Sequence, residues 1–270
     1  MEKLMTTLGE ITVDLVTGFV ESRDGYRISY RCEGDGPAVV LLHGGGGTKD
    51  SWWRVGYAEG LRGYKLIAPD MRGNGESDKP PRPDDYYIDT VMDDVLRVAD
   101  ACAADAFTAI GFSIGAEIAK HIAASSDRAE RLVMIGGGFG ASAFGDLAER
   151  LPAIRRRFKV LAEELDHSVL DFSSLTPTER TWVEKYHLPS WVHILAQMSH
   201  WPPVRPRDLR CSVLLIIGSE NADAVAQAER YRGEMAGAGV RLEVLEGKSH
   251  VEEFTDVGRV LPAIQRFLNE

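Results

Sequence analysis

Cysteines are few in this 270-residue sequence: there are only three, at Cys32, Cys102 and Cys211. The number is odd, and no two of them form a Cys-x-x-Cys pair. This pattern argues against a disulfide framework and against a zinc site built on cysteine pairs. We expect the three thiols to fill small apolar spaces in the interior.

The sequence also lacks long apolar runs and an excess of positive charge. No window comes close to the roughly 18 consecutive apolar residues that a membrane-spanning helix needs, and the N-terminus does not have the pattern of a secretory signal peptide. The net charge is −10 at pH 7, with a sequence pI of about 5.3. An acidic surface repels phosphate backbones and anionic membranes. We therefore expect a cytoplasmic protein that binds neither nucleic acid nor membranes.

Short apolar runs alternate with segments of helical periodicity. Eight runs stand out: Phe19–Val20, Ile28–Tyr30, Ala38–Leu42, Leu66–Ala68, Phe107–Gly111, Leu132–Ile135, Val213–Ile217 and Leu242–Leu245. Near-continuous apolar runs are typical of strands buried on both faces of a parallel sheet. Helix-period segments such as Val91–Cys102 and Ile114–Ala124 separate the later runs. Asp24-Gly25, between the first two runs, predicts a hairpin. The sequence thus predicts an α/β fold whose sheet opens with an antiparallel pair.

The segment 138–205 interrupts this alternation, because it contains no convincing strand. Six of its apolar residues follow helical spacing: Leu147, Leu151, Ile154, Phe158, Leu161 and Leu165. Thr176-Pro177-Thr178-Glu179 has the pattern of a capping box with proline at the first helical position, and Leu188-Pro189 predicts the end of that helix. We expect residues 1–137 and 206–270 to form one core, and residues 138–205 to form a helical cap over an active site.

A candidate nucleophile follows the fifth apolar run. Gly111-Phe112-Ser113-Ile114-Gly115 lies between a predicted strand and a predicted helix. This is the setting of a nucleophile elbow, in which the serine occupies a tight, strained turn and small residues are needed on either side. The positive end of the following helix then points at the reacting centre. The sequence predicts Ser113 as a nucleophile.

A glycine-rich loop is the candidate oxyanion site. His43 is followed by four glycines, Gly44 to Gly47, directly after the run Ala38–Leu42. Such a loop can turn backbone N–H groups inward, and the residue after the nucleophile supplies a second donor. We therefore predict Gly45 and Ile114 as the oxyanion donors. His43, Gly44 and Phe112 are predicted to line the substrate pocket.

His250 is the candidate general base. It follows the last apolar run and precedes the helical segment Val257–Leu268, and it comes after Ser113 in the chain. A histidine at this place can reach back over the sheet edge to the serine.

The cap is rich in aromatic residues and histidines, which favours an aromatic, partly polar pocket wall. These residues are Trp182, Tyr186, His187, Trp191, His193, His200 and Trp201. Trp191 is the predicted pocket residue among them. The histidines do not share a regular metal-ligand spacing, so no metal site is expected.

Together these motifs, in this order, resemble the α/β-hydrolase superfamily, in particular its capped esterase, C–C hydrolase and haloperoxidase-like members. The stretch Asp70-Met71-Arg72-Gly73-Asn74-Gly75-Glu76-Ser77 is part of the resemblance and has a structural role in the family. The resemblance implies a mostly parallel eight-stranded sheet with helices on both faces and a helical cap. It also implies a serine hydrolase that needs no cofactor.

The residue that orients His250 is left open by the sequence. The family places its acid three residues after the glycine that closes the seventh strand, which here is Gly218, so the matching position is Asn221. An asparagine can accept the imidazole N–H but lacks the charge that stabilises an imidazolium. Asp223 is therefore the favoured acid, with Asn221 as the main alternative and Glu220 as a third.

The expected activity is hydrolysis of a small to medium carboxylic ester or lactone through an acyl-enzyme, by a monomer or homodimer. Three other functions remain open because this scaffold hosts many chemistries. A C–C bond hydrolase would use the same residues on a β-diketone-type substrate. A cofactor-free oxygenase would depend on the histidine more than on the serine. A non-catalytic small-molecule binder would retain only the fold.

Overall fold

The computed structural model describes residues 2–7, 12–140 and 147–270. Its strands are β1 (Glu2–Thr7), β2 (Thr12–Glu21), β3 (Arg27–Glu33), β4 (Ala38–Leu42), β5 (Lys65–Pro69), β6 (Phe107–Phe112), β7 (Ala129–Ile135), β8 (Ser212–Gly218) and β9 (Arg241–Leu245). They form one sheet in the order β1-β2-β3-β5-β4-β6-β7-β8-β9. The three pairings from β1 to β5 are antiparallel, and the five from β5 to β9 are parallel.

The predicted α/β-hydrolase fold is confirmed. Each of the eight predicted runs lies in one strand from β2 to β9, and the hairpin at Asp24-Gly25 joins β2 to β3. The described sheet has one strand more than expected, because β1 adds to the free edge of β2. Its sequence, Glu-Lys-Leu-Met-Thr-Thr, alternates too weakly to be read as a strand, so its pairing with β2 decides its conformation.

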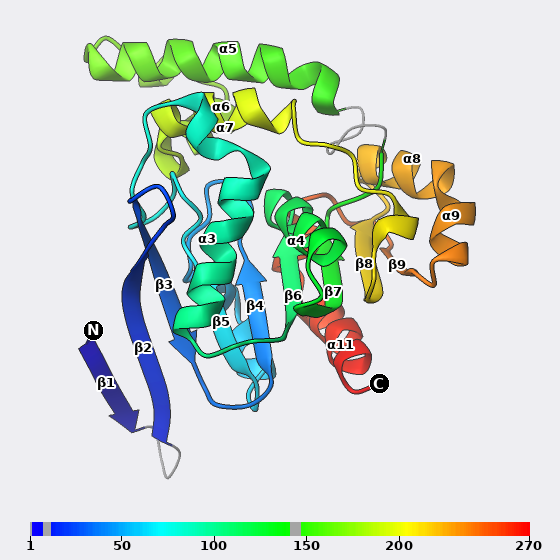
Figure 1. Cartoon of the computed structure of the whole chain (residues 1–270). Helices are drawn as coiled ribbons and strands as arrows, with labels where there is room; N and C mark the ends of the chain where they lie inside the picture. The colour runs from blue at the N-terminus through cyan, green and yellow to red at the C-terminus, as the bar shows by residue number, and fades with distance from the viewer. Residues whose placement is uncertain (1, 8–11, 141–146) are drawn as a thin grey trace.

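The helices cover both faces of the sheet (Figure 1). They are α1 (Ser51–Val55), α2 (Tyr57–Gly60), α3 (Ile88–Ala101), α4 (Ile114–Ser125), α5 (Leu147–Asp166), α6 (Pro177–Lys185), α7 (Leu188–Met198), α8 (Ala222–Arg230), α9 (Arg232–Gly237), α10 (Glu252–Thr255) and α11 (Val257–Leu268). Apolar residues of α3 and α4 share one buried cluster, and those of α11 belong to a second. Successive residues of β4 alternate between them: Val40 and Leu42 face the first, Val39 and Leu41 the second.

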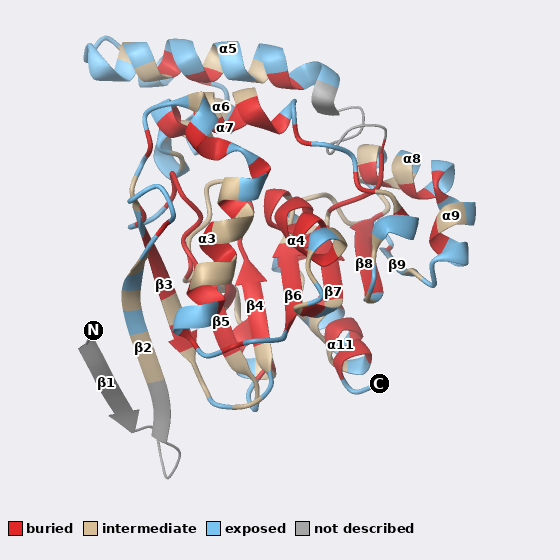
Figure 2. Cartoon of the chain, viewed as in Figure 1, coloured by how far each residue is buried: buried red, intermediate tan, exposed pale blue. Residues whose placement is uncertain are grey.

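Burial separates the sheet from the segment above it. Figure 2 shows β4, β6 and β7 buried along most of their length, whereas α5 has a narrow buried stripe and a broad exposed side. The buried residues of that stripe include Leu151, Phe158 and Leu161, which recur at helical spacing. This stripe packs on α7, and Phe158 also contacts Trp182 of α6.

The helices α5, α6 and α7 lie together beyond the carboxyl ends of β4 and β6 (Figure 1). The predicted capping box at the start of α6 is confirmed, since Thr176 accepts from Glu179 N and Glu179 accepts from Thr176 N. The prediction that Leu188-Pro189 ends this helix is wrong. Both residues begin α7, where proline is tolerated because the first-turn N–H groups have no partner within the helix. The division into core and cap stays a prediction.

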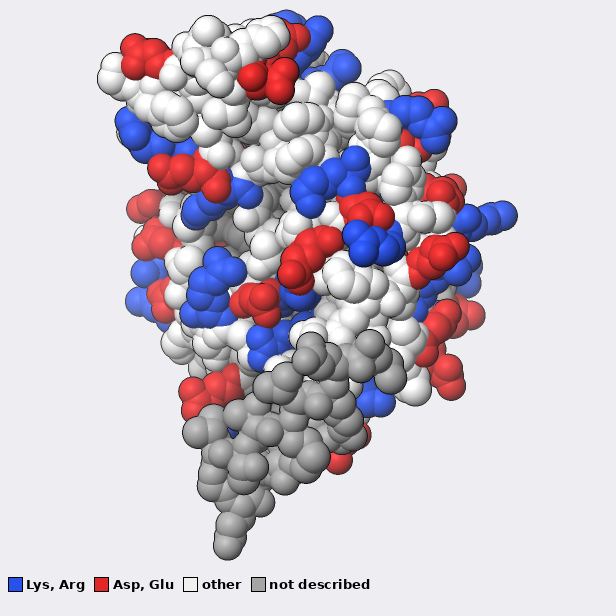
Figure 3. Space-filling model, turned by 90° about the vertical axis from the view of Figure 1, so that its left-hand side faces the viewer, with Lys and Arg blue, Asp and Glu red and all other residues white. Residues whose placement is uncertain are grey.

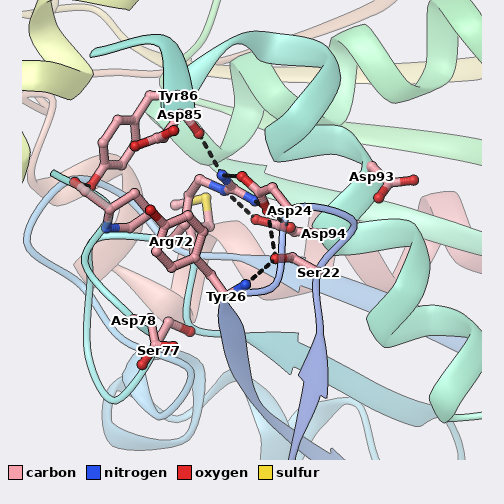
Figure 4. Close-up of polar contacts among 12 residues, drawn as sticks. Ser22, Asp24, Tyr26, Arg72, Ser77, Asp78, Asp85, Tyr86, Asp93 and Asp94 are labelled. Atoms are coloured by element: carbon pink, nitrogen blue, oxygen red, sulfur yellow. Dashed lines mark hydrogen bonds and ion pairs between the residues drawn. The ribbon is translucent and has the colours of Figure 1, made fainter. Parts of the chain in front are cut away.

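The stretch Asp70–Ser77 holds the loops around the candidate site by polar contacts (Figure 4). The buried Arg72 guanidinium contacts the Asp94 carboxylate at 2.6 Å and 2.8 Å, and the Asp24 carboxylate at 2.9 Å and 3.1 Å. It also donates to the carbonyl of Asp85 at 2.5 Å. Because these acceptors come from the β2–β3 hairpin, α3 and the loop before α3, one side chain ties three segments together.

Charges of both signs are interspersed on the face shown in Figure 3. Opposite charges that lie close together cancel one another beyond about one Debye length, roughly 8 Å at physiological ionic strength. No helix in the described part of the chain has the length and apolar character needed to cross a bilayer.

Candidate active site

Ser113 lies at the sharp turn between β6 and α4. Its backbone has φ 55° and ψ −120°, a conformation that costs a non-glycine residue on the order of 1–3 kcal/mol. The turn is held by Ser113 N, which donates to Ile135 O at 2.9 Å, and by Ser113 O, which accepts from Ala116 N at 2.9 Å. The predicted elbow geometry is therefore present, with the side chain of Ser113 at the carboxyl end of the sheet.

Glycine is required on both sides of this turn. A Cβ atom on Gly111 would lie 2.2 Å from the carbonyl oxygen of Gly115, and one on Gly115 would lie 2.3 Å from the carbonyl oxygen of Leu42. Both contacts are with backbone atoms, which cannot move aside without displacing β4 or α4. The small residues predicted from the motif are thus explained by close backbone approach.

His250 reaches Ser113, as the sequence predicts. The distance from His250 Nε2 to Ser113 Oγ is 3.0 Å, although the residues are 137 positions apart. The imidazole belongs to the loop between β9 and α10, and its side chain is 42% exposed. A serine hydroxyl at this distance can transfer its proton to the imidazole.

The carboxylate beside His250 is Glu253, which the sequence analysis did not identify. Its Oε2 lies 2.7 Å from His250 Nδ1, and the side chain is fully buried. Its Oε1 accepts from Gly218 N at 2.6 Å and from Asn221 Nδ2 at 2.9 Å. Ser113, His250 and Glu253 thus form a continuous hydrogen-bonded series, the geometry of a nucleophile, a base and an orienting acid.

The prediction that Asp223 orients His250 is wrong. Asp223 lies in the first turn of α8 and forms an ion pair with Arg150, and both side chains are largely exposed. Asn221 caps α8, so Asp223 follows it onto the outer side of the helix, away from the imidazole. Glu220 is exposed as well. Asn221 does lie near the imidazole, with Nδ2 at 3.2 Å from His250 Nδ1, but its closer polar contact is with Glu253.

One local signal in the sequence points to Glu253: it lies three residues after His250. Residues three apart on one helical turn are neighbours, and α10 begins at Glu252. The sequence offers Glu252 and Glu253 side by side, however, and only burial separates them. Glu252 accepts from Ser249 N and Oγ, while Glu253 points into the protein.

Phe112 packs against His250, and its place in the substrate pocket stays a prediction. Its ring stacks on the imidazole with centroids 5.0 Å apart and on Phe254 at 4.7 Å. Phe254 in turn packs edge-on against Trp52. Gly44 makes room for this stack, because a Cβ atom there would lie 2.5 Å from the Phe112 ring. An aromatic column therefore fixes the plane of the imidazole.

The side chain of His43 is fully buried, so it does not line a pocket as predicted. Its Nδ1 lies 2.8 Å from Gly44 O, and its Nε2 accepts from Met71 N at 3.2 Å. The imidazole is therefore neutral with its proton on Nδ1, and burial lowers the pKa of His43 accordingly. It braces the glycine loop against the loop after β5.

The glycine loop faces helices α6 and α7. A Cβ atom on Gly45 would lie 2.9 Å from the Tyr186 hydroxyl and 3.0 Å from the Trp191 ring. Burial raises the pKa of Tyr186 to about 12. Among the described residues, no hydrogen bond uses the N–H of Gly45 or Ile114 as its donor. Both groups are available to a ligand, as the oxyanion prediction requires, but that role remains a prediction.

A small cavity of about 20 Å³ lies between α4 and α7. Its walls are Met71, Arg72, Asn74, Tyr86, Val91, Ile114, Ile118, Trp191, Ile194 and Trp201. Trp191 is thus the predicted pocket residue that does line it, and its Nε1 donates to Asn74 Oδ1 at 3.0 Å. The volume holds about one water molecule, and the walls are mainly apolar. In the part of the chain that is described, no three potential ligands gather closely enough to hold a metal ion.

Comparison with known proteins identifies the family. Residues 37–202, more than half of the chain, match the model described as "alpha/beta hydrolase fold". The chain therefore belongs to the α/β-hydrolase fold family.

Its relatives include several kinds of hydrolase. The chain is 31% identical over 171 residues to protein phosphatase methylesterase 1 of Pongo abelii, a match that covers 60% of this chain and 43% of that protein. It is 33% identical over 113 residues to epoxide hydrolase 2 of Siraitia grosvenorii, covering 42% and 36% respectively. These curated relatives are matched over less than half of their own length.

A similar solved structure comes from work on carboxylesterases of Nitrososphaera gargenis. It has a TM-score of 0.75 and 21% identity, and the match covers 93% of this chain and 98% of that one. At this identity the likeness establishes the fold alone.

Proposed function

We propose that this protein is a serine hydrolase that cleaves a small to medium carboxylic ester or lactone through an acyl-enzyme. The observation that carries the proposal is the unbroken series from Ser113 Oγ to His250 Nε2 and from His250 Nδ1 to Glu253 Oε2, at 3.0 Å and 2.7 Å. Each distance permits proton transfer or charge stabilisation, and the serine occupies a strained elbow at the end of a parallel strand.

In the first half of the reaction, Ser113 Oγ attacks the carbonyl carbon of the substrate while its proton passes to His250 Nε2. The Glu253 carboxylate stabilises the imidazolium that forms. The N–H groups of Gly45 and Ile114 hold the oxyanion of the tetrahedral intermediate. His250 then gives its proton to the leaving alkoxide, and the carbon–oxygen bond to it breaks.

In the second half, His250 takes a proton from a water molecule as the water oxygen attacks the acyl carbon. The second tetrahedral intermediate collapses, and the bond to Ser113 Oγ breaks. His250 returns the proton to Oγ, and the acid product leaves. No redox partner or cofactor is required by this sequence of steps.

The cavity supports a substrate with an apolar acyl or alcohol group. Its walls are mainly aliphatic and aromatic, and Ile114, a predicted oxyanion donor, is one of them. A volume of about 20 Å³ is too small for such a group. The segment with Tyr186 and Trp191 therefore has to shift from the glycine loop when substrate binds, as lids do in many enzymes.

The test is intact mass spectrometry after exposure to a fluorophosphonate, with Ser113→Ala as control. The reagent requires an activated serine and little knowledge of the substrate. We expect one adduct on the wild-type protein and none on Ser113→Ala, followed by turnover of an ester and lactone panel. A folded wild-type protein that gives no adduct at high reagent concentration contradicts the proposal.

Further outcomes separate the other functions. Carbon–carbon cleavage products from a β-diketone would redirect the assignment to a C–C hydrolase. Oxygen uptake that survives Ser113→Ala would indicate an oxygenase. Tight ligand binding without turnover and without an adduct would indicate a binding protein.

A further inference from the structure

Two segments from different parts of the fold converge on the Nδ1 atom of His250. One is the loop after β8, which brings Asn221 Nδ2 to 3.2 Å. The other is α10, which brings Glu253 Oε2 to 2.7 Å. The family resemblance predicts an acid at position 221. In this protein the carboxylate beside His250 belongs to Glu253, and position 221 carries asparagine, the uncharged isostere of aspartate.

The hydrogen bonds assign a direction to each contact. With Nε2 accepting from Ser113, the imidazole proton is on Nδ1 and points to Glu253 Oε2. A carboxylate oxygen only accepts, so the group of Asn221 at 2.9 Å from Glu253 Oε1 is the NH₂ of the amide. The contact between Asn221 Nδ2 and His250 Nδ1 then joins two donors and is no hydrogen bond. Asn221 therefore acts on the carboxylate and not on the imidazole.

Glu253 depends on this donor because it is fully buried. Three N–H groups satisfy its carboxylate: those of Gly218, Asn221 and His250. All three belong to neutral groups in the resting state, so no permanent cation cancels the negative charge. Loss of one donor would disfavour the ionised form of this buried carboxylate, and the Glu253 side chain would be free to rotate away from His250.

We propose that Asn221 is a positioning residue that holds Glu253 against His250, and that position 221 is a second acid position to which the carboxylate can be transferred. The proposal rests on the serine-hydrolase function above. Replacing the amide of Asn221 with a carboxylate puts an acceptor oxygen about where Nδ2 now lies, 3.2 Å from His250 Nδ1.

The exchange Asn221→Asp with Glu253→Gln moves the carboxylate from position 253 to position 221. Oε1 of Glu253 accepts from both Gly218 N and Asn221 Nδ2, and Oε2 accepts from His250 Nδ1. The glutamine oxygen keeps the bond from Gly218 N when it takes the Oε1 place, and its NH₂ group then has to turn away from the His250 Nδ1–H toward the new aspartate. The aspartate accepts from His250 Nδ1. The single change Asn221→Asp has the opposite effect, because it places two carboxylates with oxygens about 2.9 Å apart. One of them is then protonated at neutral pH.

The experiment compares the second-order rate of phosphonylation of Ser113 in the wild type, Glu253→Gln, Asn221→Asp and the double variant. Glu253→Gln should slow the reaction by about 10³–10⁴-fold, as loss of the acid does in other triads. The double variant should recover at least about tenfold of this loss. Asn221→Asp alone should be slower than the wild type at pH 7, and its rate should show an additional dependence on pH that the wild type lacks.

Asn221→Ala provides the readout for positioning. For an ester of the panel that the wild type hydrolyses, we expect kcat to fall by about 10–100-fold with KM unchanged, because the Asn221 amide donates to Glu253 and acts through it. Asp223→Asn is the matched control: it removes a carboxylate two residues away that pairs with Arg150, and it should leave the rate unchanged. Circular dichroism and thermal unfolding confirm that each variant is folded.

The outcomes distinguish the two proposals. A wild-type protein that does not react contradicts the serine-hydrolase function itself. Suppose that the wild type reacts and that Glu253→Gln reacts slowly, as expected. If the folded double variant is then no faster than Glu253→Gln, position 221 is not a second acid position. An unchanged kcat in Asn221→Ala overturns its positioning role.

Discussion

Two buried carboxylates in this protein are neutralised in different ways. Asp94 faces the guanidinium of Arg72, a permanent cation that also binds Asp24. Glu253 faces only N–H donors and the imidazole of His250. Asp94 therefore has a cation beside it in every state of the folded protein, and its role is to hold segments together. The charge of Glu253 is available when an imidazolium forms beside it. A network that stabilises the fold and a network suited to catalysis thus differ in whether the cation is permanent or transient.

The largest expected effect comes from breaking the contacts of Arg72 with Asp94 and Asp24. Arg72→Met removes the cation and leaves Asp94 buried without a counter-ion, which costs about 3–5 kcal/mol in the free energy of unfolding. Urea denaturation monitored by tryptophan fluorescence measures this loss. Arg27→Met is the matched control, because Arg27 pairs with Asp78 at the surface, where its side chain is 64% exposed. That change should cost about 0–1 kcal/mol. Equal losses in both variants would contradict the structural role of Arg72.

A smaller effect is expected from the aromatic column beneath His250. Phe112→Leu keeps the volume roughly constant but removes the stack on the imidazole. An aromatic pair contributes about 0.5–1.5 kcal/mol, so the rate of phosphonylation should fall by up to about tenfold. Phe107→Leu, at the start of the same strand and more deeply buried, is the control for general destabilisation. If both variants retain the wild-type rate, Phe112 does not orient the base.

A separate effect concerns the pH dependence of stability. Burial is the main cause that raises the pKa of Asp94 from 3.8 to about 6; Arg72 acts against it, and the nearby carboxylates of Asp24 and Asp93 add to it. The hydrogen bond to Arg72 lowers the pKa of Asp24 to about 2. The folded state thus binds the proton on Asp94 more tightly than the unfolded state does, and this group's contribution to stability falls as pH rises from about 4 to 6. Asp24 acts in the opposite sense, and its contribution is lost as pH falls from about 4 to 2.

Asp94→Asn isolates the first of these contributions. In the wild type, Asp94 makes the free energy of unfolding fall as pH rises from about 4 to 6, and this contribution should be absent in the variant. The fall in the free energy of unfolding as pH drops below about 4, which comes from Asp24, should remain. Denaturation curves at intervals of half a pH unit measure both slopes. Identical slopes in the wild type and the variant between pH 4 and 6 would show that Asp94 titrates normally.

The positions of Ser113, His250 and the glycine loop were predictable because their signals are local. The elbow needs a strand, a strained residue between two glycines and a helix, and all of these are visible within fifteen residues around Ser113. Because His250 comes after Ser113 in the chain, the sequence also predicted that these two residues act as a pair. The structure brings these two side chains together, and it gives backbone reasons for Gly111 and Gly115.

The sequence by itself determined the α/β architecture, the elbow and the histidine, since periodicity and backbone strain are properties of neighbouring residues. Only the tertiary structure decided which carboxylate meets His250. Asp223, Glu252 and Glu253 are chemically equivalent candidates in the sequence, and their exposure differs because α8 and α10 dock on the sheet with particular sides facing inward. Docking depends on contacts between residues far apart in the chain. The same reason placed the side chain of His43 in the interior instead of in the expected pocket.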